Sequence, residues 1–131
     1  MFSSIKVWIF VGLLVLGGCS APSPRTYSAP HIATPPVIDG RLRDTAWSTA
    51  PWTEAFIDIE GPEKKHPAYR TRAKMCWDDT NLYVAADMEE PHLWGTLTER
   101  DAIIYRDNDF EIFIDPDGDR AEYNEYEINV L

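Results

Sequence analysis

Acidic side chains alternate with apolar ones along residues 105–119, and acids in this arrangement could bond a polar ligand. Successive side chains of a strand point to opposite faces, so Phe110, Ile112 and Ile114 would share an apolar face. The opposite face would carry Asp109, Glu111, Phe113 and Asp115. We therefore expect a half-buried strand whose outer face could hold a sugar, a cation or only water.

A second alternating segment begins at Tyr123 and would place Glu125, Glu127 and Asn129 on one face. Residues 116–119, between the two segments, contain the Pro, Asp and Gly that favour hairpin loops. Glu111 and Glu127 would then lie on the same face of neighbouring strands. Paired carboxylates perform glycoside hydrolysis when their separation is suitable. Acids that point outward from a strand more often only face solvent, so the residues themselves leave a catalytic role and a solvated face open.

Three aspartates gather in the loop between these segments: Asp115, Asp117 and Asp119. Calcium prefers hard oxygen ligands such as carboxylates, so the loop could hold a structural calcium ion. The spacing is not that of an EF-hand. Asp and Gly also favour turns without any ion, and turn chemistry is the alternative.

Tyr105 precedes the acidic strand and has Arg106 and Asp107 beside it. An exposed aromatic ring next to acids suits a sugar, because the C–H face of the sugar stacks on the ring while its hydroxyls bond the carboxylates. An aromatic contact of this kind adds roughly 0.5–1.5 kcal/mol beyond the area it buries. Most other aromatic side chains, including Trp77 on the apolar face of its strand, are expected to pack in the core.

The elements that must position these residues are predicted to be short strands. Residues 69–77 and 82–88 alternate around a turn cluster at 78–81, which indicates a β-hairpin. Asp44 is expected to cap a short helical turn that carries Trp47. Repeated short strands predict an all-β fold, an antiparallel β-sandwich of jelly-roll-like form. Because the sequence stops within an apparent strand, we expect the sandwich to be incomplete at its C-terminus.

The beginning of the sequence predicts export and lipid anchoring. Lys6 precedes an apolar run, 7–16, that is too short to span a bilayer, and Cys19 follows two glycines as in a lipobox. The expected organisation is a lipoprotein signal peptide at 1–18, a lipidated Cys19, a Pro/Ser-rich tether without packing at 19–35 and a domain at 36–131. The protein would then be lipid-anchored in a bacterial cell envelope, at the outer membrane or the cell surface. The alternative is an ordinary signal peptide with an accidental cysteine.

The charge argues against nucleic acid as a partner, and the cysteine content argues against a disulfide within the chain. The formal net charge of the 131 residues is −10. Binding to nucleic acid requires Lys and Arg for the phosphates, so nucleic acid is not an expected partner. Once Cys19 carries lipid, Cys76 has no partner within the chain for a disulfide.

Three segments, in this order, resemble carbohydrate-binding module family 9. They are residues 37–47 (VIDGRLRDTAW), 77–84 (WDDTNLYV) and 107–115 (DNDFEIFID). The resemblance covers roughly residues 36–131. It implies a β-sandwich that binds oligo- or polysaccharide and supports polysaccharide capture and carbohydrate catabolism. Such modules are often attached to O-glycosyl hydrolases that act on plant polysaccharides.

The resemblance also implies roles for individual residues. In the family, an aromatic sandwich clamps a sugar at a chain end, and calcium ions are structural. Tyr105 corresponds to the first aromatic residue of that sandwich, Glu111 to the family's strand glutamate and Asn129 to a family asparagine. Glu127 departs from the pattern, because the family has a basic residue there. The partner tryptophan is expected beyond Leu131.

Two alternatives to a carbohydrate-binding module remain open. We find no convincing catalytic apparatus in the chain, so a glycoside hydrolase activity would depend on residues outside it. The same fold group includes haem-binding relatives, and a structural or haem-carrying envelope module is the second alternative. Met75 and Met88 are expected in the core rather than as haem ligands.

Overall fold

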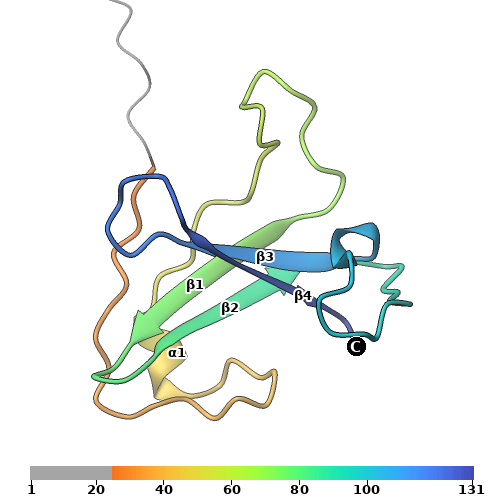
Figure 1. Cartoon of the computed structure of the whole chain (residues 1–131). Helices are drawn as coiled ribbons and strands as arrows, with labels where there is room; N and C mark the ends of the chain where they lie inside the picture. Colours follow the sequence, from red (N-terminus) through yellow and green to blue (C-terminus); the bar gives the residue numbers. More distant parts are fainter. Residues whose placement is uncertain (1–24) are drawn as a thin grey trace, which may run out of the picture.

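The computed structural model describes residues 25–131, and its regular elements are mainly strands (Figure 1). Within these residues, four strands form two antiparallel hairpins. The elements run in the order α1 (Thr45–Thr49), β1 (Thr71–Trp77), β2 (Leu82–Met88), the 3₁₀ helix η1 (Ile104–Arg106), β3 (Asp109–Ile114) and β4 (Asn124–Asn129). The predicted all-β, antiparallel class is confirmed.

The hairpin of β1 and β2 is closed by an aspartate. Its register runs from the pair Thr71–Met88 to the pair Trp77–Leu82. Asp78 Oδ1 accepts the backbone N–H groups of Thr80 at 2.8 Å and Asn81 at 2.7 Å. This bonding reverses the chain where the turn cluster 78–81 was predicted, as is usual for Asp in turns.

The hairpin of β3 and β4 has a longer connection than the predicted four-residue turn. The strands pair from Asp109–Asn129 to Ile114–Asn124, and residues 115–123 join them. Arg120 and Glu122 have φ angles of 68° and 49°. Two non-glycine residues in the left-handed region give the connection extra bends that residues 116–119 alone could not supply.

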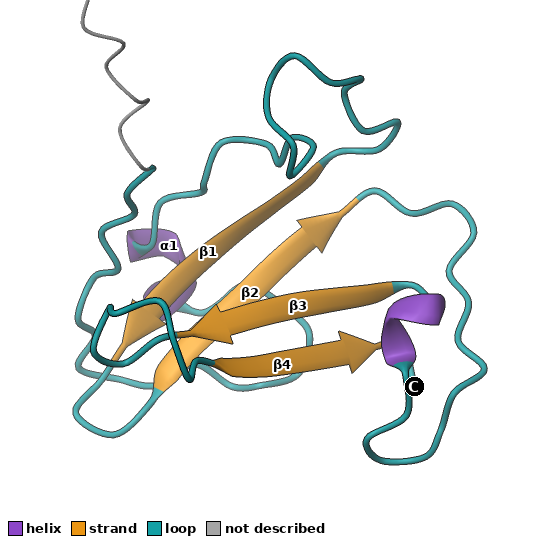
Figure 2. Ribbon diagram, turned by 45° about the horizontal axis from the view of Figure 1, so that its top comes forward, coloured by secondary structure: helices purple, strands orange, loops and turns teal. Residues whose placement is uncertain are grey.

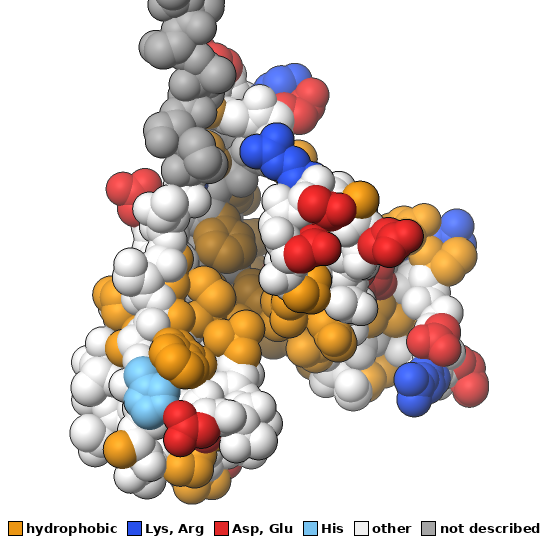
Figure 3. Space-filling view, turned by 60° about the vertical axis from the view of Figure 1, so that its left-hand side comes forward, with side chains coloured by type: hydrophobic (Ala, Val, Ile, Leu, Met, Phe, Trp, Pro, Cys, Tyr) orange, Lys and Arg blue, Asp and Glu red, His pale blue; other side chains and the backbone are white. Residues whose placement is uncertain are grey.

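The two hairpins are stacked as layers through their apolar faces (Figure 2). An open groove of about 820 Å³ lies between them, lined by Val84 and Ala86 of β2 and by Phe110 and Ile112 of β3. Hydrophobic side chains gather around the hollow between the two lobes of the molecule (Figure 3). The period-two pattern therefore assigned the inward face of β3 correctly.

The other face of the β1–β2 sheet is covered by α1 and the segment before it. Trp47 is 3% exposed and Cys76 is 0% exposed, and both belong to a core cluster with Ile32. Lys74 Nζ donates a hydrogen bond to the carbonyl oxygen of Trp47 at 2.7 Å. Burial lowers the pKa of Lys74. The sheet is thus covered on both sides, including the side that carries its basic residues.

Asp44 occupies the N-cap position of α1, as predicted, but its side chain makes no capping hydrogen bond to the helix. Instead, Asp44 Oδ2 accepts the backbone N–H of Val37 at 3.1 Å. The aspartate therefore ties the preceding segment to the helix start.

The described end of the predicted tether packs against the sheet. Ile32 is buried, its N–H bonds the carbonyl of Trp77 at 2.8 Å, and His31 stacks edge-on against the Trp77 ring. The expectation that this segment does not pack is therefore wrong for these residues. The predicted signal peptide and Cys19 lie outside the described residues.

Candidate ligand-binding site

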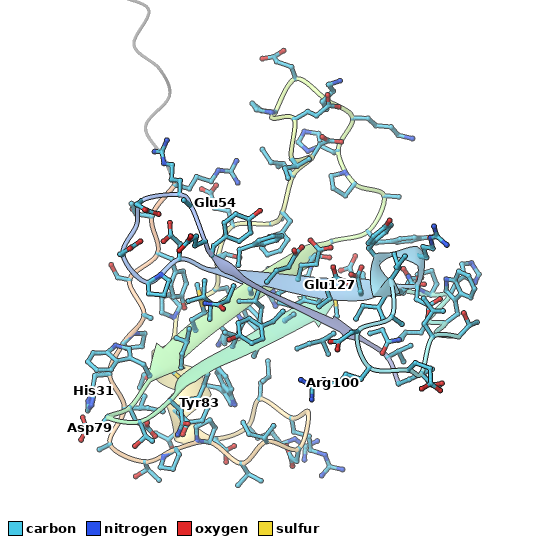
Figure 4. All side chains as sticks on the ribbon, in the orientation of Figure 1. His31, Glu54, Asp79, Tyr83, Arg100 and Glu127 are labelled. Carbon is cyan, nitrogen blue, oxygen red and sulfur yellow. The ribbon has the colours of Figure 1, made fainter. Side chains whose placement is uncertain are left out.

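The outer face of β3 and β4 brings three glutamates together. Glu111 lies directly opposite Glu127 in the strand register, and Glu125 follows on the same face of β4. One carboxylate oxygen of each lies within 4.8 Å of the others. The predicted placement of Glu111 and Glu127 on one face is confirmed. Figure 4 labels Glu127 on this hairpin.

The charges on this face disfavour one another. Burial raises the pKa of Glu111, and the negative charges of Asp109, Glu125 and Glu127 raise it further. Burial also raises the pKa of Asp109, whose Oδ2 atom is shielded from solvent and has no hydrogen-bond partner among the described residues. We call these four residues the acidic face. Its three glutamates, which are exposed or partly exposed, offer hydrogen-bond acceptors that a hydroxyl-rich ligand could use.

A groove of about 900 Å³ adjoins this face along β4, and we call it the β4 groove. One wall is the segment 125–129 of β4, which includes Glu125, Glu127 and Asn129. The other wall is the loop segment 97–102, which includes Arg100. The groove therefore combines acceptor side chains from the sheet with a separate loop.

Tyr105 lies in η1, the 3₁₀ helix that packs against β4. Its neighbour Ile104 lines the β4 groove, while the side chain of Tyr105 itself is 61% exposed. The ring is thus accessible for stacking, beside the groove rather than within its lining.

Asn129 is held by the loop that it faces. Its Nδ2 donates to the carbonyl oxygen of Leu97 at 2.9 Å, and its Oδ1 accepts the N–H of Leu131 at 3.2 Å. A carbonyl oxygen can accept two hydrogen bonds, so Oδ1 keeps one lone pair for a ligand.

Asp107 is the residue of this region whose role the sequence did not indicate. The sequence placed it beside Tyr105 and at the start of the family-like segment 107–115, and the structure shows that it is only 8% exposed. Its carboxylate accepts the N–H groups of Thr96 at 2.6 Å and Leu97 at 2.8 Å. These bonds hold the pKa of Asp107 below its usual range. Local sequence could not reveal this burial, because the hydrogen-bond partners of Asp107 lie ten or more residues away.

The aspartate-rich loop has a clear structural role. Asp115 accepts the N–H of Gly118 at 3.0 Å and of Arg120 at 2.8 Å, which lowers its pKa. Asp117 and Asp119 each accept a backbone N–H two residues ahead. One carboxylate oxygen from each of the three also lies within 4.8 Å of the others. Turn chemistry explains the aspartates, and the oxygen cluster also has the donor type that calcium prefers.

Two stacked antiparallel hairpins with a polar groove beside one of them define a small all-β module. Residues 38–130 match the family described as carbohydrate family 9 binding domain-like. This match covers most of the chain, and the chain therefore belongs to that family. The resemblance of the three sequence segments is confirmed.

Two curated proteins contain a region similar to this chain. An exoglucanase XynX of Acetivibrio thermocellus is 30% identical over 90 residues, and an endo-1,4-beta-xylanase A of Thermotoga neapolitana is 31% identical over 90 residues. Each match covers 69% of this chain and 8% of the relative. The chain thus corresponds to a small part of each enzyme.

No solved structure matches the chain. Among the described residues, no helix has both the length and the apolar character that crossing a membrane would require.

Proposed function

We propose that this domain binds neutral oligo- or polysaccharide through the acidic face and the adjoining β4 groove. The observation that carries the proposal is the convergence of Glu111 and Glu127 beside an open groove, in a chain that belongs to a carbohydrate-binding family. Hydroxyl groups donate readily to carboxylates, and hydrogen bonds to charged groups contribute roughly 1.5–3 kcal/mol each.

Each predicted contact residue has a distinct role in this proposal. Tyr105 stacks on the apolar face of a sugar ring, and Glu111 and Glu127 accept hydroxyl hydrogen bonds. The free lone pair of Asn129 Oδ1 accepts a further one. A few such contacts correspond to micromolar affinity, at about 8 kcal/mol of binding free energy.

The relatives suggest the polymer and the context. Their names refer to glucan and β-1,4-xylan hydrolysis, so we propose a β-1,4-linked xylan or glucan chain as ligand. We further propose that the module serves a glycoside hydrolase, with catalytic residues outside this chain.

Two predictions from the sequence complete the proposal. Lipidation of Cys19 would place the module in the bacterial cell envelope, within reach of extracellular polysaccharide. Calcium bound by Asp115, Asp117 and Asp119 would stiffen the connection between β3 and β4. The donor set supports this ion, because all three ligands are carboxylate oxygens.

Calorimetric titration tests the function directly. The full-length protein, with calcium present, is titrated with xylose, glucose, cellobiose and xylo-oligosaccharides. We expect saturable binding to at least one oligosaccharide, and we expect Tyr105→Ala to weaken it about tenfold, since an aromatic contact contributes up to roughly 1.5 kcal/mol.

A matched control is Tyr123→Ala. Tyr123 is 52% exposed and packs against Phe113. It lies outside the lining of the β4 groove. Equal losses of affinity in both variants would remove Tyr105 from the site, and a folded wild-type protein that binds none of these sugars would overturn the proposed function.

A further inference from the structure

We propose that Asp107 is a positioning residue that fixes the loop wall of the β4 groove and thereby sets its affinity for a sugar. The inference rests on the proposed function of the groove. It assigns a role to a buried acid that touches no ligand.

The carboxylate of Asp107 binds two consecutive loop residues. Oδ2 accepts the backbone N–H groups of both Thr96 and Leu97, and Oδ1 accepts the Thr96 hydroxyl at 3.0 Å. Hydrogen bonds to an ionised acceptor are roughly twice as strong as neutral ones. Because Asp107 is only 8% exposed, little solvent is available to replace these bonds.

Two neighbouring contacts attach the same segment to β4. Asn129 Nδ2 bonds the carbonyl of Leu97. A Cβ atom added to Gly95 would lie 2.7 Å from Val130 Cγ1, so the backbone at Gly95 packs closely against the Val130 side chain, just after β4. The segment 95–97 therefore contacts both Asp107 and the C-terminal end of the β3–β4 hairpin.

The wall of the groove begins where these contacts end. Leu97 is the first residue of the wall, and the loop then continues through Arg100 before it reaches η1. Without the bonds of Asp107, the wall has only the contacts of Asn129 and Gly95 at its start. A loop that already has its binding conformation before the ligand arrives gives higher affinity, because no conformational entropy is lost in ordering it on binding.

The test is Asp107→Asn in the full-length protein. Asparagine has nearly the same size, but it loses the charge and replaces one acceptor oxygen with an NH₂ donor. We expect amide hydrogen exchange at Thr96 and Leu97 to accelerate at least tenfold while exchange in β1 and β2 is unchanged. Affinity for a xylo-oligosaccharide should fall about tenfold, which corresponds to about 1.4 kcal/mol.

Asp78→Asn is the matched control. Asp78 also accepts two backbone N–H groups, from Thr80 and Asn81, and a hydroxyl, from Tyr83. It closes the other hairpin, and Figure 4 shows Tyr83 and Asp79 at the lower left of the molecule, away from Glu127. We expect this variant to lose local stability at its own turn without losing sugar affinity.

The outcomes separate the two proposals. Unchanged exchange at Thr96 and Leu97 in Asp107→Asn, or equal losses of affinity in both Asn variants, overturns the positioning role. If Asp107→Asn does not fold, Thr96→Val tests the positioning role instead, because it removes only the hydroxyl bond to Asp107 Oδ1. It should show the same changes in exchange and affinity on a smaller scale. If the wild-type protein binds no sugar, the proposed function is overturned, and so is the proposed effect of Asp107 on affinity. Amide hydrogen exchange at Thr96 and Leu97 would still show whether Asp107 holds the loop.

Discussion

At the residue scale, the acidic face and the nearby Asp107 provide two opposite electrostatic environments. Burial raises the pKa values of both Glu111 and Asp109, and neighbouring negative charges raise that of Glu111 further. Asp107 has a lowered pKa because backbone N–H groups stabilise its charge. Asp109 thus keeps one shielded carboxylate oxygen without a hydrogen-bond partner among the described residues, whereas Asp107 accepts three hydrogen bonds. Glu111 is exposed, so a sugar that donates hydroxyls to it would replace water as its hydrogen-bond donor.

These opposite shifts predict how stability depends on pH. A raised carboxyl pKa means that the folded state binds protons more readily, so the free energy of unfolding rises as pH falls from neutrality towards the ordinary value of roughly 4.3. A carboxyl group whose pKa is lowered by folding, such as Asp107, stabilises the fold at pH values above its ordinary pKa of roughly 3.9. This stabilisation is lost as pH falls through the lower pKa of the folded state. Urea unfolding should therefore show a maximum of stability in mild acid.

Glu111→Gln is the variant that checks this assignment. It removes the raised carboxyl and the charge opposite Glu127, so we expect higher stability than wild type at pH 7 and a smaller rise between pH 7 and about 5. The loss of stability in stronger acid should remain. A rise identical to that of wild type would show that Glu111 is not its source.

At the scale of elements, each hairpin depends on a different kind of support. The β1–β2 hairpin has α1 on one face and the other hairpin on the opposite face. The β3–β4 hairpin has its inner face over a groove, and its outer face carries the acids. We therefore expect the β1–β2 sheet to contribute most of the stability and the β3–β4 sheet to contribute the site.

Trp47→Ala tests the support of the first hairpin. The Trp47 side chain is almost fully buried between α1 and β1, and replacing a buried tryptophan by alanine costs about 3–5 kcal/mol. Trp94→Ala, at an exposed position, should change stability by less than about 0.5 kcal/mol. Similar losses in the two variants, measured by urea unfolding, would contradict the proposed core.

Sequence patterns predicted what depends on local periodicity and missed what depends on distant contacts. Alternation alone placed Glu111 and Glu127 on one face, because a strand has a period of two. It could not indicate that Asp107 is buried, because its partners come from a loop ten residues away. Nor could it indicate that α1 covers the side of β1 that carries Lys74, since nothing in a strand pattern specifies which element packs on it.

At the scale of the whole molecule, the family and the architecture agree. The chain belongs to a carbohydrate-binding family, and in the proposed site the strands would supply the acceptors while the loop at 97–102 would supply a wall. The net charge of −10 favours neutral over acidic polysaccharides. The predicted calcium ion would stabilise the molecule by holding together the connection between the two strands of the β3–β4 hairpin.

Removal of calcium is therefore expected to lower thermal stability. A ligand that binds only the folded state stabilises it in proportion to the logarithm of its concentration. The melting temperature of wild type should fall on addition of a chelator and recover with excess calcium, whereas Asp117→Asn with Asp119→Asn should show neither change. An equal response of the double variant would place the calcium elsewhere, and no response of wild type would contradict the calcium proposal.

The central claim is that a sugar binds at the acidic face and the β4 groove, and chemical-shift mapping tests it most directly. The labelled protein is titrated with xylo-oligosaccharide or cello-oligosaccharide while the amide resonances of all residues are followed. We predict that the largest shifts occur at Tyr105, Glu111 and Glu127, with little change at the 78–81 turn. Shifts concentrated on β1 and β2, or no shifts from a folded protein, would contradict the account.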